Sequence, residues 1–309
     1  MTKPFFFVLF AVSLFSRSSR LDAQLVIAPE DFGTLAVKRA DFAPPGAIDA
    51  GVQTQPGFTR QLLQVQWRPG DPIDLYIVRP ENAVKPSVVV FLYSWPDGTD
   101  RFRNDTWCRN ITQHGFAAVG FVSALTGHRY HDRPWKQTFV SELPEALVKT
   151  THDVQLLLDY LATRSDLDTT RIGMFGQGSG GTIALLAASV EPRLKAVDVI
   201  DPWGDWPEWF RASPVIPDSE HAHYNDPAFL KSVAPFDPLS ILPGLTQRDL
   251  RLEQTTLNPS TPEAAREALH KAIPAGAAYT IYTSEKDYRS RAMKDSSILD
   301  WLQSKLATP

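Results

Sequence analysis

A stretch near the middle of the chain joins an apolar strand, a glycine-rich turn and a helix of small residues. Residues 171–181 read Arg-Ile-Gly-Met-Phe-Gly-Gln-Gly-Ser-Gly-Gly. Glycines at 176, 178 and 180 permit left-handed dihedrals in the turn and let the following helix lie close to the strand. The chain is thereby constrained to a layered fold in which a buried strand leads directly into a helix.

Apolar, β-branched runs alternate with helical patterns along most of the chain. This alternation predicts an α/β fold with a mostly parallel central sheet and helices on both faces. Strands are expected at 59–67, 74–78, 87–93, 116–122, 171–175, 195–200, 250–257 and 278–283. Helices are expected at 107–113, 143–161, 180–190, 262–273 and 291–306. Residues 204–246 are rich in proline and tryptophan without a clear period, so we expect an inserted cap there.

The N-terminus has the pattern of a secretory signal peptide over residues 1–23. Lys3 precedes the apolar run Phe5 to Phe15, and a polar stretch ends at Ala23. The apolar run is too short to span a bilayer, although an uncleaved N-terminal anchor stays open as an alternative. We therefore expect a secreted or periplasmic protein with no membrane span after cleavage, an extended segment at 24–58 and one domain at 59–309.

Charge and cysteine content bear on which partners the protein can bind and on whether it can form a disulfide. The formal net charge is −4, with no basic excess, which argues against nucleic acid as a partner. The single cysteine, Cys108, excludes an intramolecular disulfide. It lies in an expected helix, where a buried thiol acts as a small packing residue.

From about Thr59 to Leu306 the chain resembles the α/β-hydrolase superfamily. The residues that carry the resemblance are 170–176, the Gly180-Gly181 start of the small-residue helix, and the strand at 195–200. The nearest group is that of dienelactone hydrolases, acetyl esterases and prolyl oligopeptidases. The resemblance implies an α/β-hydrolase fold with a cap at about 204–246 and a Gly-x-Ser-x-Gly elbow. Gly178 stands at the serine position of that elbow.

The resemblance also implies where the rest of a catalytic triad should follow, first an acid and then a histidine. In the acid segment, Asn-Pro-Ser-Thr-Pro, Asn258 stands where an aspartate is expected. In the segment after the last strand, 284–288, Asp287 stands where the histidine is expected. Reading 285–287 as the acid loop fails, because the last histidine of the chain is His270. A triad degenerate at three positions predicts an inactive or impaired hydrolase, a pseudoenzyme.

An alternative keeps the chemistry and moves the nucleophile to Ser179. Its base would then come from a relocated histidine, either in the 127–133 loop (His128, His131) or in the cap (His221, His223). His128, His131 and Asp132 together also suggest a metal site, but no fourth ligand follows at a suitable spacing. A nucleotide-binding glycine loop fits less well, because several strands precede it and no P-loop lysine follows Gly181. We expect no metal and no cofactor.

Two classes of function remain open for this fold. The first is a noncatalytic binding protein, with a small molecule or a protein partner over Gly178. The second is an atypical esterase-like hydrolase. The candidate ligand-contacting residues are Tyr93, Ser94, Gln177, Trp203 and Trp206; packing between the cap and the sheet is an equal alternative for the tryptophans.

Overall fold

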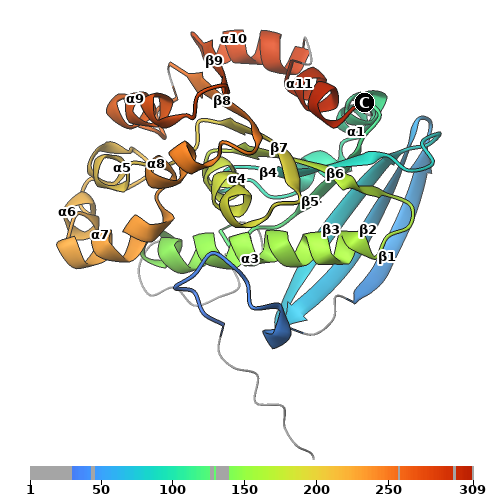
Figure 1. Cartoon of the computed structure of the whole chain (residues 1–309), viewed down its shortest axis with the longest axis horizontal. Helices are drawn as coiled ribbons and strands as arrows, with labels where there is room; N and C mark the ends of the chain where they lie inside the picture. The colour runs from blue at the N-terminus through green and yellow to red at the C-terminus, as the bar shows by residue number, and fades with distance from the viewer. Residues whose placement is uncertain are drawn as a thin grey trace, which may run out of the picture.

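One twisted sheet of nine strands runs through the protein, with helices on both sides (Figure 1). The computed structural model describes residues 30–42, 46–125, 129, 139–256, 258–294 and 297–307. The strand order is β1-β2-β3-β5-β4-β6-β7-β8-β9. The strands are β1 (Ala47–Gln55), β2 (Phe58–Arg68), β3 (Asp71–Pro80), β4 (Ser87–Leu92), β5 (Ala117–Phe121), β6 (Asp168–Gln177), β7 (Leu194–Ile200), β8 (Asp249–Thr255) and β9 (Ala278–Tyr282).

The sheet is mostly parallel, as the alternation of elements predicts. The strands from β5 through β9 in the sheet order pair in parallel, whereas β1, β2, β3 and β5 pair antiparallel. The parallel strands all end at one edge, where loops follow β4, β6, β7, β8 and β9. Ligand sites of α/β folds lie at this carboxyl edge.

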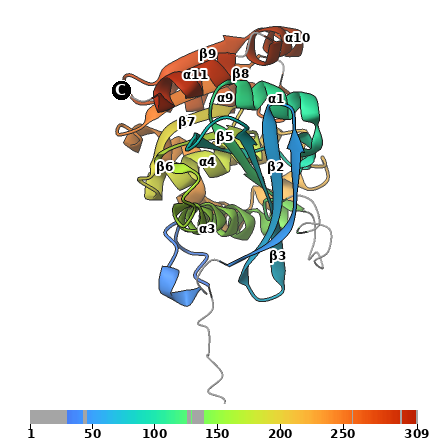
Figure 2. The ribbon, with the colours of Figure 1, turned by 90° about the vertical axis from the view of Figure 1, so that its right-hand side faces the viewer.

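The two faces of the sheet are covered by different helices (Figure 2). On one side lie α3 (Leu143–Ala162) and α4 (Ser179–Val190), and on the other lie α1 (Asp105–Gln113) and α11 (Ser297–Leu306). Strand β4 is buried on both faces, as a central parallel strand must be. Its side chains alternate accordingly: Val88, Val90 and Leu92 join the core under α3 and α4, and Val89 and Phe91 join the core under α1 and α11.

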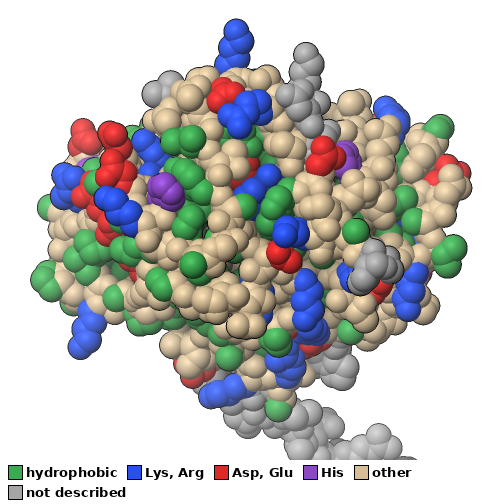
Figure 3. All heavy atoms as spheres, turned by 45° about the horizontal axis from the view of Figure 1, so that its top comes forward, with side chains coloured by type: hydrophobic (Ala, Val, Ile, Leu, Met, Phe, Trp, Pro, Cys, Tyr) green, Lys and Arg blue, Asp and Glu red, His purple; other side chains and the backbone are tan. Residues whose placement is uncertain are grey.

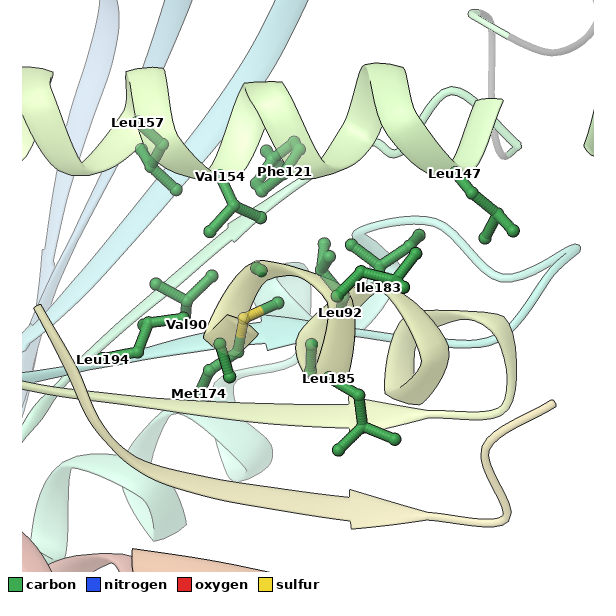
Figure 4. Close-up of a cluster of buried hydrophobic side chains, with 14 of the residues drawn as sticks. Val90, Leu92, Phe121, Leu147, Val154, Leu157, Met174, Ile183, Leu185 and Leu194 are labelled. Atoms are coloured by element: carbon green, nitrogen blue, oxygen red, sulfur yellow. The ribbon is translucent and has the colours of Figure 1, made fainter. Parts of the chain in front are cut away.

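The larger core lies between the sheet and the helices α3 and α4 (Figure 4). Leu147, Val154 and Leu157 point from α3 toward the side chains of α4 and of the sheet beneath it. All three are fully buried. At about 25 cal/mol per Å² of apolar surface removed from water, this packing is the main stabilising contribution.

The expected cap is a set of short helices that follow β7 and lie beside α9 (Glu263–Ala272) (Figure 1). It contains α5 (Trp206–Ala212), α6 (His221–Tyr224), α7 (Pro227–Val233) and α8 (Pro238–Ile241), with 3-10 turns at Ala234–Phe236 and Leu242–Gly244. Asp226 and Asp237 cap α7 and α8 by accepting hydrogen bonds from backbone N–H groups. Proline begins α5, α7 and α8, and these helices are only four to seven residues long, which is too short for a helical period to show in the sequence.

The N-terminal segment, expected to be extended through residue 58, contains a strand of the sheet. It contains β1, which pairs antiparallel with β2 and forms one edge of the sheet. Nearly every residue of β1 is exposed on both faces. Such a strand carries no alternation of apolar and polar residues, so its sequence held no strand signal.

Residues 30–38 are held against α3 by buried charges. Glu30 accepts hydrogen bonds from Arg68 Nε at 2.5 Å and faces His152 Nδ1 at 2.6 Å. Asp153, fully buried, binds Arg68 and also Arg129, whose Nη1 lies 2.8 Å from Asp153 Oδ2. The two guanidinium groups hold the pKa of Asp153 far below its usual value despite the opposing effect of burial.

The last expected helix, 291–306, is two elements. A π-helical turn at Arg289–Lys294 follows α10 (Glu285–Tyr288), and α11 begins at Ser297.

On the face seen in Figure 3, acidic and basic side chains are interspersed. Within the described ranges, no helix has both the length and the apolar character needed to cross a bilayer.

Candidate functional site

The glycine-rich turn has the geometry of a nucleophile elbow. Strand β6 ends at Gln177, α4 begins at Ser179, and Gly178 between them has φ 52° and ψ −120°. A non-glycine residue at this φ is strained, and enzymes with this fold accept the strain to expose their nucleophile. The predicted strand, turn and helix are therefore confirmed, and the turn is an elbow rather than a phosphate-binding loop.

The glycines on either side are required by close backbone packing. A Cβ atom added to Gly176 would lie 2.4 Å from the carbonyl oxygen of Gly180. One added to Gly180 would lie 2.3 Å from the carbonyl oxygen of Leu92. Because backbone atoms cannot move aside without disrupting β4 and β6, neither position accepts a side chain.

At Gly178 the obstacle is a side chain. A Cβ atom there would lie 2.2 Å from Ser94 Oγ and 2.7 Å from Ser94 Cβ. Ser94 follows β4, so the hydroxyl of a different strand's loop occupies the space in which the nucleophile would stand. Trp203 Nε1, 3.4 Å from the same point, limits that space further.

Ser179, the alternative nucleophile, is buried. Only 1% of it is exposed, and its Oγ accepts a hydrogen bond from the backbone N–H of Trp95 at 2.9 Å. In α/β-hydrolases, a backbone N–H from this loop normally stabilises the oxyanion of the substrate. Here that donor is bound to the serine hydroxyl instead.

Asn258 has a structural partner at the expected acid position. Its Nδ2 donates to Asp201 Oδ2 at 2.8 Å, and its Oδ1 accepts from Ser260 N at 2.9 Å. Asp201 has φ 46° and also accepts from the Thr255 N–H and hydroxyl, both at 2.8 Å. Burial raises the pKa of Asp201 even though these donors favour its charged form. The amide of Asn258 therefore joins the loops that follow β7 and β8.

Asp287, at the expected histidine position, closes the turn after β9. Its Oδ2 accepts from the Thr283 N–H at 2.9 Å and lies 3.3 Å from Arg291 Nη1. The backbone N–H of Thr283, and then Arg291, lower the pKa of Asp287. A carboxylate stabilised in this way is a weaker base, and its hydrogen bonds give Asp287 a structural role in the turn.

The histidines that the structure describes are engaged elsewhere. None of them bonds to Ser94 or Ser179 within the described ranges, and His128 and His131 lie outside those ranges, as does Asp132. His270 is exposed on α9 and stacks on Tyr279 with ring centroids 3.7 Å apart. The ring nitrogens of the others have these contacts: His114 with Asn110 O and Asp300, His152 with Glu30 and Thr34 O, and His221 with Phe210 O, while His223 packs against Tyr224.

The expected ligand-contacting residues separate into different environments. Trp203 and Trp206 are each 1% exposed, and Trp203 packs against Trp209 with ring centroids 4.8 Å apart. Their rings thus join the cap to the sheet. Gln177 is half-buried beside the elbow, and Tyr93 is buried in the core under α1 and α11. Of the five, Ser94 and Trp203 have side-chain atoms next to Gly178, and Ser94 comes nearest.

No group of His, Cys, Asp and Glu side chains suited to holding a metal occurs among the residues with described positions. Cys108 is buried and its pKa is raised by burial, consistent with a packing role.

The sequence did not identify Asp201 as the partner of Asn258. The one sequence feature that pointed to Asp201 was its place in the Asp-Pro-Trp segment directly after a buried strand.

The contact between Gly178 and Ser94 predicts a stability cost for restoring the elbow serine. Gly178→Ser should lower the free energy of unfolding by about 1–3 kcal/mol, because the new Cβ overlaps the Ser94 side chain. Urea denaturation would measure it. Ser94→Gly in the same background should recover part of the loss, since it removes the overlapping atoms; equal costs in both backgrounds would contradict the contact.

Restoring an acid at position 258 should be unfavourable at neutral pH. Asn258→Asp replaces a donor by a carboxylate oxygen against Asp201 Oδ2, and we expect a loss of roughly 1–3 kcal/mol at pH 7. The two carboxyls then share a folded-state pKa above the unfolded value, so stability is greater at low pH and is lost as pH rises through the folded pKa. The deficit in thermal unfolding should therefore shrink from pH 7 to pH 5. Adding Asp201→Asn should abolish this pH dependence, and a deficit independent of pH would refute the pairing.

Comparisons with known proteins agree with this geometry. The dienelactone hydrolase family matches residues 73–230, just over half of the 309 residues. A Yersinia pestis protein assigned as a carboxymethylenebutenolidase is 30% identical over 132 residues, which are 41% of this chain and 48% of that protein. The chain therefore matches about half the length of this curated relative.

Solved structures of esterases share the fold. Acetyl xylan esterase from Paenibacillus sp. R4 superposes with a TM-score of 0.66 at 16% identity, over 85% of this chain and 90% of that one. Glucuronoyl esterase from Solibacter usitatus gives 0.58 at 16% identity, over 84% and 86% of the respective chains. With an elbow between β6 and α4, a mostly parallel sheet and this sequence match, the chain belongs to the dienelactone hydrolase family and has an α/β-hydrolase fold.

Proposed function

We propose that this chain is an exported, catalytically impaired member of its family that binds a small molecule or a protein partner. The observation that carries the proposal is the elbow itself. Gly178 has no nucleophile to offer, and Ser94 Oγ fills the space that a nucleophile's side chain would need. Removing the serine or the histidine of a triad costs on the order of a million-fold in turnover.

The surroundings of Ser179 support the same conclusion. Its hydroxyl is buried and bound to the Trp95 N–H, and a nucleophile needs a base within hydrogen-bond reach. Asn258 and Asp287 each hold a turn through hydrogen bonds. The degenerate positions therefore have structural uses that a triad residue would disturb.

The second candidate is an atypical esterase-like hydrolase that uses Ser179 and a relocated histidine. The names of the relatives, a carboxymethylenebutenolidase and several esterases, favour it. His128 or His131 would have to supply the base, since the other histidines have partners or positions away from Ser179.

A fluorophosphonate probe and short p-nitrophenyl esters distinguish the two candidates. We expect no labelling of the purified protein and no ester turnover above buffer. Ser94→Ala and Ser179→Ala should behave as the unaltered protein does, and Ser189→Ala, at the exposed far end of α4, is the matched control. Labelling and turnover that disappear in Ser179→Ala, but persist in Ser189→Ala, would establish the esterase instead.

Export is proposed from the N-terminal sequence. Expressed in bacteria, the full chain should be cleaved before Gln24 and recovered without residues 1–23, which N-terminal sequencing of the periplasmic fraction would detect. Leu9→Arg should block processing, because it places a charge in the apolar run Phe5 to Phe15. An uncleaved chain in the membrane fraction would favour the N-terminal anchor.

A further inference from the structure

A cavity lies on the face of the sheet opposite α4, between α1 and α11. We call it the α1–α11 cavity. Its enclosed part has a volume of ≈ 60 Å³. An open groove of ≈ 820 Å³ along α1 lies next to it and shares the lining residues Arg101, Trp107 and Asn110. The remaining lining residues of the enclosed part are Phe91, Tyr93, Ile111, Phe175, Tyr288, Ala292, Ile298 and Leu299.

The mouth of this cavity carries positive charge from arginine side chains. Arg101 is half-buried, and its guanidinium carbon lies 4.3 Å from the centroid of the Tyr93 ring. Among the described residues, no carboxylate pairs with Arg101 or with Arg109, which lines the groove. Asp100, the acid beside them, lies 3.8 Å from Arg103 instead. A half-buried guanidinium at the mouth of a cavity attracts an anion, because its hydrogen-bond donors are only partly used.

The interior selects an apolar group of limited size. Its walls are mostly aromatic and aliphatic, and a cavity needs roughly 10–15 Å³ to hold one water molecule. The enclosed part therefore accommodates about four or five heavy atoms. Burial raises the pKa values of both phenols, Tyr93 and Tyr288, so that these hydroxyls stay neutral and do not oppose a negative charge.

We propose that the α1–α11 cavity binds a short aliphatic monocarboxylate, with its chain in the enclosed part and its carboxylate on Arg101. This inference rests on the binding role proposed above and gives it a site and a class of ligand. The site is separate from the elbow, because Ser94 and Gly178 do not line it.

Titration of the full chain with sodium salts of defined acids tests the proposal. Calorimetry and the fluorescence of the protein would follow acetate, butyrate and hexanoate, with butyramide and inorganic phosphate as probes that lack either the charge or the chain. Each buried methylene should tighten binding about fourfold until the cavity is full, so we expect butyrate to bind roughly fifteen-fold more tightly than acetate. Butyramide and phosphate should bind at least tenfold more weakly than butyrate.

Two variants locate the site. Arg101→Gln should weaken butyrate binding at least tenfold by removing the cation, and Ala292→Leu should do so by filling the enclosed part. Arg211→Gln, an exposed arginine paired with Glu208 in the cap, is the matched control and should leave binding unchanged. Circular dichroism would confirm folding, and Ala292→Leu keeps the test decisive if Arg101→Gln does not fold.

Three results would overturn the proposal: no saturable binding of any of these acids at tens of millimolar, equal binding of butyramide or phosphate, or butyrate binding that neither variant weakens. Ester turnover in the same samples bears on the proposed function alone. Turnover with butyrate binding intact would refute the impaired hydrolase and leave the carboxylate site standing. If neither turnover nor butyrate binding is found, the carboxylate site is refuted and the impaired hydrolase stands.

Discussion

The close approach of the first turn of α4 to β4 and β6 is the constraint on which the rest of this structure depends. At Gly176 and Gly180 the backbones lie so near that a single Cβ atom would overlap a carbonyl oxygen. This approach buries α4 across the centre of the sheet and brings the loop after β4 against the elbow. The positions and contacts of Ser94 and Trp95 depend on this close approach.

The same packing explains how the elbow can form with glycine at its tip. A left-handed residue between β6 and α4 connects strand to helix whether or not it bears a hydroxyl, and glycine adopts that conformation without strain. Once the side chain is absent, Ser94 can occupy its space, and Ser179 can bind the Trp95 N–H. The side chains that pack against the elbow thus occupy the space and use the hydrogen-bond donor that triad chemistry would need.

Much of the fold could be predicted from local patterns, because buried strands and amphipathic helices have distinct periods. The strand at 195–200 and the helix at 180–190 agree with β7 and α4 to within about one residue. The exceptions have physical reasons. Strand β1 is exposed on both faces and has no alternation. The first residues expected in the final helix belong instead to a π-helical turn at Arg289–Lys294, whose register no local signal reveals.

The order of elements places the candidate residues at the ends of strands, but it does not give their contacts. Gly178, Asn258 and Asp287 could be placed at the ends of β6, β8 and β9 because the order of elements is regular. Which groups meet there depends on loops distant in sequence: Asn258 bonds Asp201, fifty-seven residues away. Tyr93 and Ser94 are adjacent, yet they face different regions, because successive side chains at the end of a strand point to opposite faces.

The sequence by itself determined the layered α/β fold, the elbow and the absence of a serine at its tip, since these follow from residue type and local spacing. Only the tertiary structure decided that Ser94 fills the nucleophile's space and that Asn258 anchors a buried aspartate. It alone also placed Arg101, which pairs with no carboxylate in the described part of the chain, at the mouth of an aromatic cavity. The physical reason is that these contacts join segments that are far apart in the sequence. Local sequence patterns do not say how close such segments lie in space, and it is the sheet that brings them together at one edge.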